Sequence, residues 1–177
     1  MRLDWPLTTE RLALRTLEVG DANGPYAAWM HDAEVTRYLE IRFAPPDAEA
    51  LLAFVDRMNA SPADLLLGLV RHDTGSHIGN IRLGPVDPHH GRAAIGILIG
   101  DRSAWGQGFA GEAIAALSDH ALHSLGLAKL TAGLYAPNES SRRAFEKAGF
   151  HVDSARRAHA VLDGRRVDVI EMARFAP

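Results

Sequence analysis

Residues 93–112 read AAIGILIGDRSAWGQGFAGE and combine three patterns. The run Ala93–Ile99 is almost continuously apolar, which is typical of a central strand covered on both faces. A turn containing Gly106, Gly108 and Gly111 follows it. Beyond the turn, helical spacing predicts one apolar stripe over residues Ala110, Ile114, Leu117, Ala121 and Leu125. We therefore expect a buried strand that leads through a glycine-rich turn into an amphipathic helix.

The glycine-rich turn is suited to binding an anion. Glycine lets backbone N–H groups point inward without a Cβ clash, and the first turn of a helix adds further free N–H groups. Two familiar phosphate motifs do not apply. No Lys-Ser/Thr pair follows Gly111, and the GxGxxG spacing that begins at Gly106 comes after at least three predicted strands instead of after the first. The residues of this turn alone are compatible both with anion binding and with a structural turn that binds no ligand.

The rest of the sequence alternates between strand and helix patterns. Upstream strands are expected at Glu10–Leu17, Leu65–Arg71 and His77–Leu83, and upstream helices from Asp21 to about Asp32, over Ala33–Leu39 and after the N-cap Asp47. Downstream we expect a strand at Leu130–Tyr135, a helix from Asn138 or Glu139 to Gly149, and a hairpin of Val152–Ala158 with Val161–Phe175 that turns at Asp163-Gly164. Together these elements predict a mixed α/β sheet.

Composition indicates one cysteine-free domain over residues 1–177. With 19 Lys+Arg against 22 Asp+Glu, the formal charge of −3 argues against a general nucleic-acid binder. Without cysteine, no disulfide, thiolate metal site or cysteine nucleophile can form. The nine histidines do not show metal-ligand spacing, so we expect no metal. The start lacks a signal-peptide core and no apolar run of about 18 residues occurs, so we expect a cytoplasmic protein without a membrane partner.

A second motif, NESSRRAFEKAGF, spans residues 138–150. Asn138 suits a helix N-cap, Ser141 and Phe145 lie one helical turn apart, and Gly149 suits the position after the helix. Helix capping accounts for this segment without any further function.

The two motifs, in this order and about 30 residues apart, resemble those of the GNAT superfamily of acyl-CoA N-acyltransferases. The branch that contains the ribosomal-protein-alanine N-acetyltransferases is the most similar. Further support comes from Thr9-Glu10-Arg11-Leu12-x-Leu14-Arg15, Trp29 with Val35-x-x-Tyr38-Leu39, the segment 105–113, and Asp163-Gly164-Arg165 with Asp168. The resemblance covers nearly the whole chain, and the order and spacing of its motifs carry it.

This resemblance implies a GNAT fold in the α/β (α+β) class. We expect a central mixed, mostly antiparallel sheet of about seven strands, flanked by about four helices. Acetyl-CoA would lie where the sheet splits between Ala93–Ile99 and Leu130–Tyr135.

The resemblance also implies a set of cofactor-binding residues. Ile97, Leu98 and Ile99 would contact the pantetheine arm, with the backbone groups of Ile97 and Ile99 pairing as an added strand would. The pyrophosphate would be held by the amides of Gly106, Gln107, Gly108, Phe109, Ala110 and Gly111. Asn138 would hydrogen-bond the pantetheine, and Ser141 would point toward the thiol.

Two departures from the family pattern affect the catalytic residues. Many members carry a Tyr where this chain has Phe145, which leaves Ser141 and Tyr135 as candidate acids for the leaving thiolate. Many also carry a Glu where this chain has Ala94.

The missing Glu bears on the acceptor, because the attacking amine must be neutral. An α-amino group near pKa 7.8 is over 10% neutral at pH 7, whereas a lysine amine near 10.4 is about 0.04% neutral. The sequence therefore favours an α-amine, or a base from elsewhere. Glu40 is the candidate that we carry forward, and Glu34, His77 and Asn80 are further candidates. Glu112 suits helix capping as well as catalysis.

We expect an N-acetyltransferase that moves an acetyl group from acetyl-CoA to a primary amine by direct attack in a ternary complex. The acceptor would be a protein N-terminal α-amine or a small-molecule amine, and the enzyme a monomer or homodimer. One alternative is a non-catalytic acyl-CoA-binding or regulatory module. Another is a nucleotide-binding domain that uses the same turn.

Overall fold

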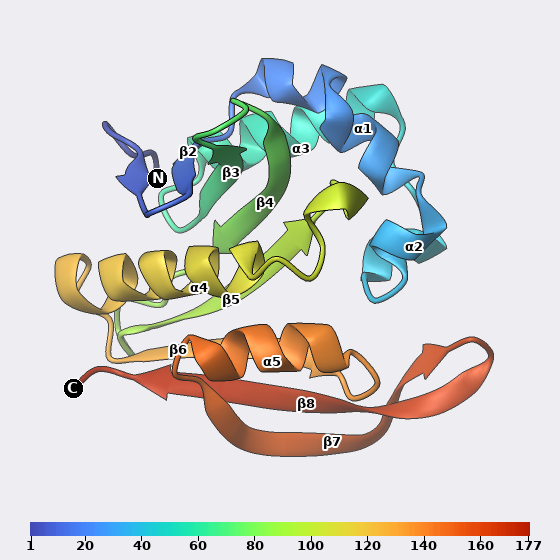
Figure 1. The fold of residues 1–177 in the computed structure, drawn as a ribbon. Helices are drawn as coiled ribbons and strands as arrows, with labels where there is room; N and C mark the ends of the chain where they lie inside the picture. Colours follow the sequence, from blue (N-terminus) through green and yellow to red (C-terminus); the bar gives the residue numbers. More distant parts are fainter.

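A computed structural model of residues 1–177 places all strands in one sheet of eight (Figure 1). From one edge to the other, the strands are β1 (Leu7–Thr8), β2 (Leu12–Thr16), β3 (Leu65–Arg71), β4 (His77–Leu83), β5 (Arg92–Ile99), β6 (Lys129–Tyr135), β8 (Arg165–Phe175) and β7 (His151–Leu162). The mixed, mostly antiparallel sheet of the predicted GNAT fold is confirmed. The sheet has one strand more than expected, because Leu7–Thr8 forms a short edge strand.

The sheet splits between β5 and β6, its one parallel pair. These strands pair only over Arg92↔Lys129, Ala93↔Leu130 and Ala94↔Thr131, whereas β5 pairs with β4 as far as Ile99. Beyond Ala94 the inner edge of β5 therefore has no partner strand.

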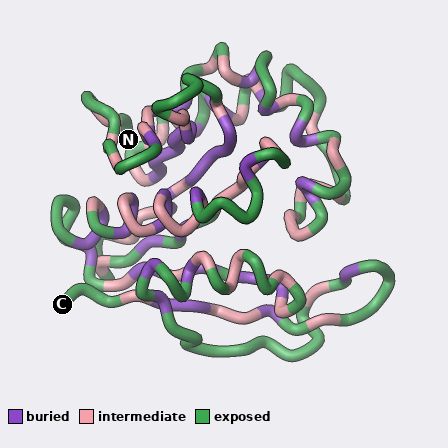
Figure 2. The backbone as a smooth tube through the Cα atoms, in the orientation of Figure 1, coloured by how far each residue is buried: buried purple, intermediate pink, exposed green.

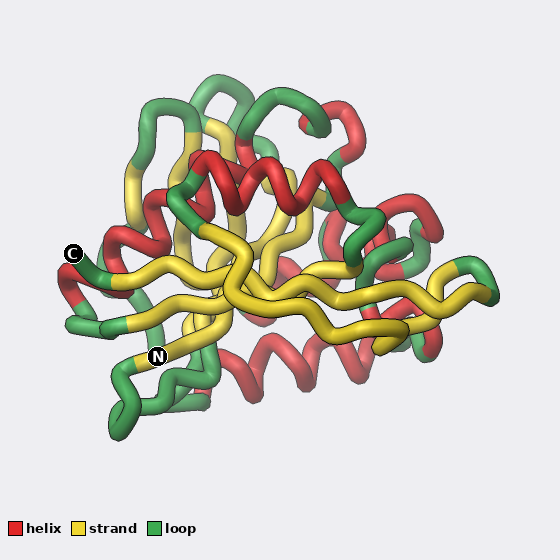
Figure 3. Tube along the Cα trace, turned by 90° about the horizontal axis from the view of Figure 1, so that it is seen from below, coloured by secondary structure: helices red, strands yellow, loops and turns green.

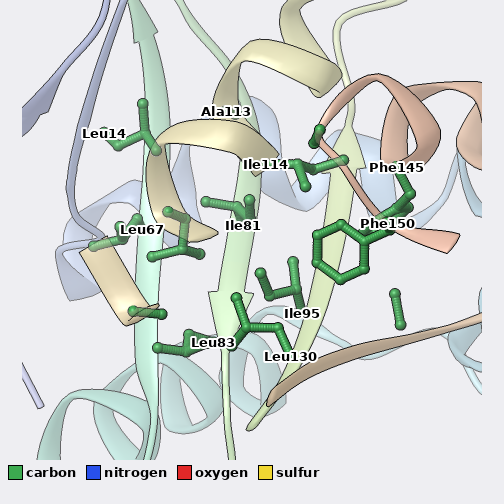
Figure 4. Close-up of a cluster of buried hydrophobic side chains, with 14 of the residues drawn as sticks. Leu14, Leu67, Ile81, Leu83, Ile95, Ala113, Ile114, Leu130, Phe145 and Phe150 are labelled. Carbon is green, nitrogen blue, oxygen red and sulfur yellow. The ribbon is translucent and has the colours of Figure 1, made fainter. Parts of the chain in front are cut away.

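Helices cover both faces of the sheet, as Figure 3 shows from below. They are α1 (Pro25–Met30), α2 (Ala33–Thr36), α3 (Ala48–Ala60), α4 (Phe109–Asp119) and α5 (Glu139–Lys147). The larger core gathers side chains of α4 and α5 with those of the strands, including Ile95, Ile114 and Phe145 (Figure 4). A second core lies under α1 and α3, around Trp29 and Val55.

One part of the sheet has no helix over it. Met172 of β8 is buried in the core beside α5, so the alternation of side chains places its neighbours Glu171 and Ala173 on the opposite face. Along the outer strand β7, every residue from His151 to His159 is exposed (Figure 2). The C-terminal half of the sheet is therefore two layers thick, with α5 on one side only.

Two predictions around the central strand are wrong. Ala93 and Ile95 are buried, but Ala94 and Gly96 are exposed, so β5 is not covered on both faces. The cause is its position beside the split, where the opposite face has no covering helix. Leu125 was expected in the stripe of α4 and is instead 39% exposed, because the helix changes to a π turn at His120–Ser124.

The prediction of a single helix from Asp21 to about Asp32 is also wrong. A 3₁₀ turn spans Val19–Asn23, and α1 begins separately at Pro25. The carboxylate of Asp21 is directed toward residues that precede it in the chain. It accepts hydrogen bonds from the Glu18 N–H (2.8 Å) and the Arg15 guanidinium (2.6 Å). Proline suits the first position of a new helix, because it has no N–H to leave unpaired there. The next helix is likewise shorter than Ala33–Leu39, since α2 ends at Thr36.

Candidate active site

The glycine-rich turn has a backbone conformation that side chains disfavour. Gly106 and Gly108 have φ values of 74° and 85°, and α4 begins immediately afterwards at Phe109. A Cβ at Gly106 would contact nothing within 4 Å. The left-handed backbone, and not a lack of space, is therefore what favours glycine at this position.

Six consecutive backbone N–H groups in this turn have no acceptor in the chain. They belong to residues 106–111, and the first helical bond of α4 is donated by Glu112 to the carbonyl of Gly108 (3.2 Å). Unpaired N–H groups at the start of a helix form a site for an anion such as a pyrophosphate. The structure thus places the predicted residues Gly106, Gln107, Gly108, Phe109, Ala110 and Gly111 in one continuous nest.

Thr9 and Arg11 brace the nest from the first hairpin. Arg11 donates to the carbonyl of Gln107 (2.9 Å) and forms an ion pair with Glu112 (2.6 Å). Glu112 also accepts from the hydroxyl of Thr9 (2.6 Å) and the N–H of Arg11 (2.9 Å). Burial opposes ionisation of Glu112, but these hydrogen bonds lower its pKa below 4.5. Glu112 is therefore a structural anchor, and the sequence did not reveal its partners.

Two residues of the nest are also packed against the interior of the protein. The side chain of Phe109 is 3% exposed, with the Arg11 guanidinium 4.5 Å from its ring centre. A Cβ at Gly111 would lie 3.6 Å from the carbonyl oxygen of Ala144 on α5. What both offer to a ligand is backbone.

Along β5, the backbone N–H and carbonyl groups of every second residue point to the open edge of the strand. Gly84 donates to the carbonyl of Ala94 (2.8 Å) and Gly100 donates to that of Ile78 (2.9 Å), so even-numbered residues of β5 face β4. Ile97 and Ile99 therefore face the split. The carbonyl of Ile99 accepts from the indole N–H of Trp105 (2.8 Å), which leaves both groups of Ile97 and the N–H of Ile99 unpaired.

Leu98 differs from its two neighbours. It pairs with Asn80 of β4, and its side chain contacts the second core. Its backbone is therefore directed away from the split, and only its side chain remains for the predicted contact with the cofactor.

On α5, Asn138 caps the helix as expected. Its Oδ1 accepts from the N–H of Ser141 (3.3 Å) and the hydroxyl of Ser140 (3.1 Å), while its amide nitrogen has no partner in the chain. The hydroxyl of Ser141 is also unpartnered, and this residue is half-buried. One turn later Phe145 is buried against Phe150, with ring centres 5.1 Å apart.

The structure brings the other two predicted catalytic residues together. The hydroxyl of Tyr135 donates to the carboxylate of Glu40 and accepts from the guanidinium of Arg42 (3.1 Å). Arg42 also donates to the carbonyl of Val161 (2.6 Å), which ties the segment 40–43 to β7. Burial, together with the bond to Glu40, raises the pKa of Tyr135. Arg42 was not foreseen from the sequence.

Ser141 lies on the other side of the sheet from Tyr135. Leu134 joins the core that contains Phe145 of α5, whereas Tyr135 contacts Leu162 and Val169 in a separate cluster. Strand β6 therefore separates the two candidate acids, with Ser141 on the side of α4 and α5 and Tyr135 on the other side.

A cavity of about 450 Å³ adjoins Arg42. Its polar lining residues include Arg37 and Asp163, which form an ion pair (2.9 Å). Its other lining residues include Met30, Thr36, Phe43 and Leu162. This places a hollow of small-molecule size on the Tyr135 side of the sheet.

The remaining candidate bases do not line this cavity. Nε2 of His77 lies 2.8 Å from Oδ1 of Asn80 and 3.0 Å from the carbonyl of Gly79, so its contacts are within β4, while Nδ2 of Asn80 is buried without a partner. His77 lines a different hollow of about 480 Å³ with Trp29 and Gly100. Glu34 is exposed in the first turn of α2.

A split sheet with an amide nest on one side and a cavity with polar lining residues on the other is the arrangement of an acyl-CoA-dependent acyltransferase. The sequence matches the family described as acetyltransferase (GNAT) domain over residues 11–151. The chain belongs to this family, and it is an acetyl-CoA-dependent N-acetyltransferase. The free amides of residues 106–111 fit the pyrophosphate of this co-substrate.

Curated relatives support the same assignment. Uncharacterized N-acetyltransferase p20 of Bacillus licheniformis is 30% identical over 165 residues, which cover 92% of each chain. Uncharacterized N-acetyltransferase YoaA of Bacillus subtilis is 31% identical over 164 residues and also covers 92% of each chain.

Solved structures share the fold. Spermidine N-acetyltransferase of Vibrio cholerae, in complex with CoA and spermine, has a TM-score of 0.84 at 22% identity, covering 94% of this chain and 96% of that chain. RimL, a ribosomal protein acetyltransferase in complex with coenzyme A, has a TM-score of 0.84 at 16% identity, covering 95% and 96%. None of the helices in the present chain has the length and apolarity needed to cross a membrane.

Proposed function

We propose that residues 1–177 act as one domain that acetylates a primary amine by direct attack in a ternary complex. The observation that carries this proposal is the alignment of two sets of unpaired backbone groups. The free edge of Ile97 and Ile99 leads toward the free N–H groups of residues 106–111. An extended chain ending in a pyrophosphate matches this arrangement.

Each cofactor contact uses a group that is free in the chain. Ile97 and Ile99 pair with the pantetheine arm, and the nest of residues 106–111 binds the pyrophosphate. The amide nitrogen of Asn138 donates to the pantetheine, and the hydroxyl of Ser141 lies toward the sulfur.

The chemistry requires two proton transfers. The neutral amine attacks the thioester carbon, so that a C–N bond forms and the C–S bond breaks. The ammonium formed on the nitrogen loses its proton, and the departing thiolate gains one from Ser141. Tyr135 and Glu40 lie on the acceptor side and help to position the amine. An unpaired backbone N–H of β5 stabilises the oxyanion.

For the acceptor we propose an exposed α-amine, of a protein N-terminus or of a small molecule. Such an amine is already over 10% neutral at pH 7, which suits a chain with Ala94 on the central strand. Among similar folds, one is named for spermidine and another for a ribosomal protein, so both classes belong in the test. A cytoplasmic location and a monomeric or homodimeric state stay predictions.

Two measurements test this function. Calorimetric titration with acetyl-CoA, CoA and ATP should show acetyl-CoA and CoA binding, with ATP binding far more weakly. Release of CoA thiol is then followed across peptides with free N-termini, amino acids, polyamines and aminoglycosides, and we expect turnover with an α-amine. Binding of CoA without turnover in any class would indicate a non-catalytic acyl-CoA module. Preferential binding of ATP would contradict the proposal outright.

A further inference from the structure

Glu171 occupies the uncovered face of the sheet, beside the split. It pairs with Gly133 of β6, and the next pair on the same face is Val169 with Tyr135. Because successive residues on one face of a strand are about 7 Å apart, Glu171 lies close to the Tyr135–Glu40 pair. Neither a motif nor the resemblance drew attention to it.

The Glu171 side chain extends over β6 toward the split. A Cβ at Gly133 would lie 3.4 Å from Oε2 of Glu171, so the carboxylate occupies the space that a side chain at position 133 would take. Strand β6 is the border of the split on this side, since its pairing with β5 ends at Thr131. Nη2 of Arg156 lies 4.0 Å from the same Cβ position, so a large side chain at position 133 would compete with both groups for this space.

The carboxylate of Glu171 is available to a ligand. No group in the chain donates a hydrogen bond to it, and its ionic partner is Arg156 at 3.8 Å. The two side chains are 30% and 51% exposed, and a long, exposed ion pair of this kind contributes little to stability. An incoming ammonium group can therefore replace Arg156 at small cost.

Strand β5, on the other side of the split, carries no carboxylate. Ala94 aligns with Thr131 in the parallel register and so lies on the same face as Glu171, as does Gly96 two residues later. Both are exposed and neither can accept a proton through its side chain. A cationic acceptor that reaches the thioester from this face meets Glu171 as the nearest acid on β6 or its neighbour β8.

We propose that Glu171 binds the ammonium group of the acceptor and accepts its proton. In the step, one N–H bond of the ammonium breaks with its proton passing to the carboxylate, and the freed electron pair forms the C–N bond as the C–S bond breaks. The nitrogen then loses its second proton to solvent, and the departing thiolate takes the proton of the Ser141 hydroxyl, which solvent restores. The protonated Glu171 then returns the proton to solvent. This role rests on the proposed function, since Glu171 supplies from β8 the carboxylate that the central strand lacks.

The test compares Glu171→Gln with the unaltered enzyme on two acceptors. One is a peptide with a free α-amine, which is largely protonated at pH 7, and the other is hydroxylamine, which is neutral there. We expect kcat/KM for the peptide to fall about tenfold, because the ammonium loses its partner and only about a tenth of the α-amine is neutral at pH 7, and that for hydroxylamine by less than about twofold. The dissociation constant for acetyl-CoA, measured by calorimetry, should not change.

Glu146→Gln is the matched control, because Glu146 is an exposed carboxylate paired with Arg142 on the outside of α5 (2.9 Å). Its rates should equal those of the unaltered enzyme. Equal losses on both acceptors, or an unchanged rate with the peptide, would overturn the role of Glu171 while leaving the acetyltransferase proposal intact. The peptide is one that the acceptor panel shows to be acetylated, and if no class in that panel gives turnover, the proposed function itself fails and this role fails with it.

Discussion

Ser141 and Tyr135 show how position decides between two chemically plausible acids. The hydroxyl proton of Tyr135 is already donated to Glu40, and its pKa is raised by burial. Ser141 has a free hydroxyl on the same side as the amide nest. In the proposed mechanism the thiolate of the co-substrate departs on that side. We therefore propose Ser141 as the acid, even though Tyr is the stronger acid in solution.

At this scale we predict that Ser141→Ala lowers kcat at least about tenfold and leaves the affinity for acetyl-CoA within about twofold. The reason is that only the transition state needs the proton. Steady-state kinetics and calorimetry provide the two readings, with Ser140→Ala as a control that removes a neighbouring exposed hydroxyl. An unaltered kcat in Ser141→Ala would remove this residue as the acid.

The turn that precedes α4 presents free amides to a ligand, with no cationic side chain in the nest. Its free N–H groups belong to residues 106–111, and the left-handed conformations at Gly106 and Gly108 orient them. Arg11 contributes from outside by fixing the carbonyl of Gln107 (2.9 Å). A net charge of −3 is thus compatible with an anionic co-substrate.

At the scale of the element we predict that Gly108→Val weakens acetyl-CoA binding at least about tenfold, because a branched side chain is strained at φ 85° and covers the amides. Gly126→Val is the matched control, since Gly126 has φ 66°, nothing within 4 Å of its Cβ position, and a place outside the site. Calorimetry should show weaker binding in the first variant alone. Equal affinity in both variants would mean that the nest does not hold the co-substrate.

Across the whole molecule, the site depends on contacts between segments far apart in the chain. Glu112 on α4 holds Thr9 and Arg11 of the first hairpin, and Arg42 holds Tyr135 and Val161 near the C-terminal hairpin. The nest and the acceptor side are therefore each braced by a contact that spans about a hundred residues. Loosening either contact should disturb function through geometry.

At this scale we predict a pH-dependent loss of stability in Glu112→Gln. The folded-state pKa of Glu112 lies below its usual value of 4.5, so its stabilisation is present above pH 4.5 and is lost as the pH falls through the lower folded-state value. Urea unfolding should show a loss of about 1–3 kcal/mol at pH 7 that shrinks toward pH 3. In Glu146→Gln, which removes an exposed pair, the loss should stay below about 0.5 kcal/mol. A loss in Glu112→Gln that is independent of pH would contradict the role of its charge.

Local sequence patterns were sufficient to predict a feature wherever the residues that cause it are neighbours in the chain. The glycines at 106 and 108, the cap Asn138 and the turn Asp163-Gly164 all depend on backbone preferences that act over a few residues. The order of the elements, and with it the family and the co-substrate, followed from these. The errors at Asp21 and Leu125 came from side-chain bonds and a π turn that such preferences do not encode.

The sequence by itself determined the alternation of elements, the amide nest and the acetyl-CoA-dependent class of enzyme, because each depends on residues close together in the chain. Only the tertiary structure decided which side chains meet beside the split. Strand pairing sets Gly133 beside Glu171, and folding brings Glu40 and Arg42 to Tyr135 over more than ninety residues. Side-chain alternation shows that Glu171 faces one side of β8, but the register with β6 is what places it beside the split, and register is set by long-range packing.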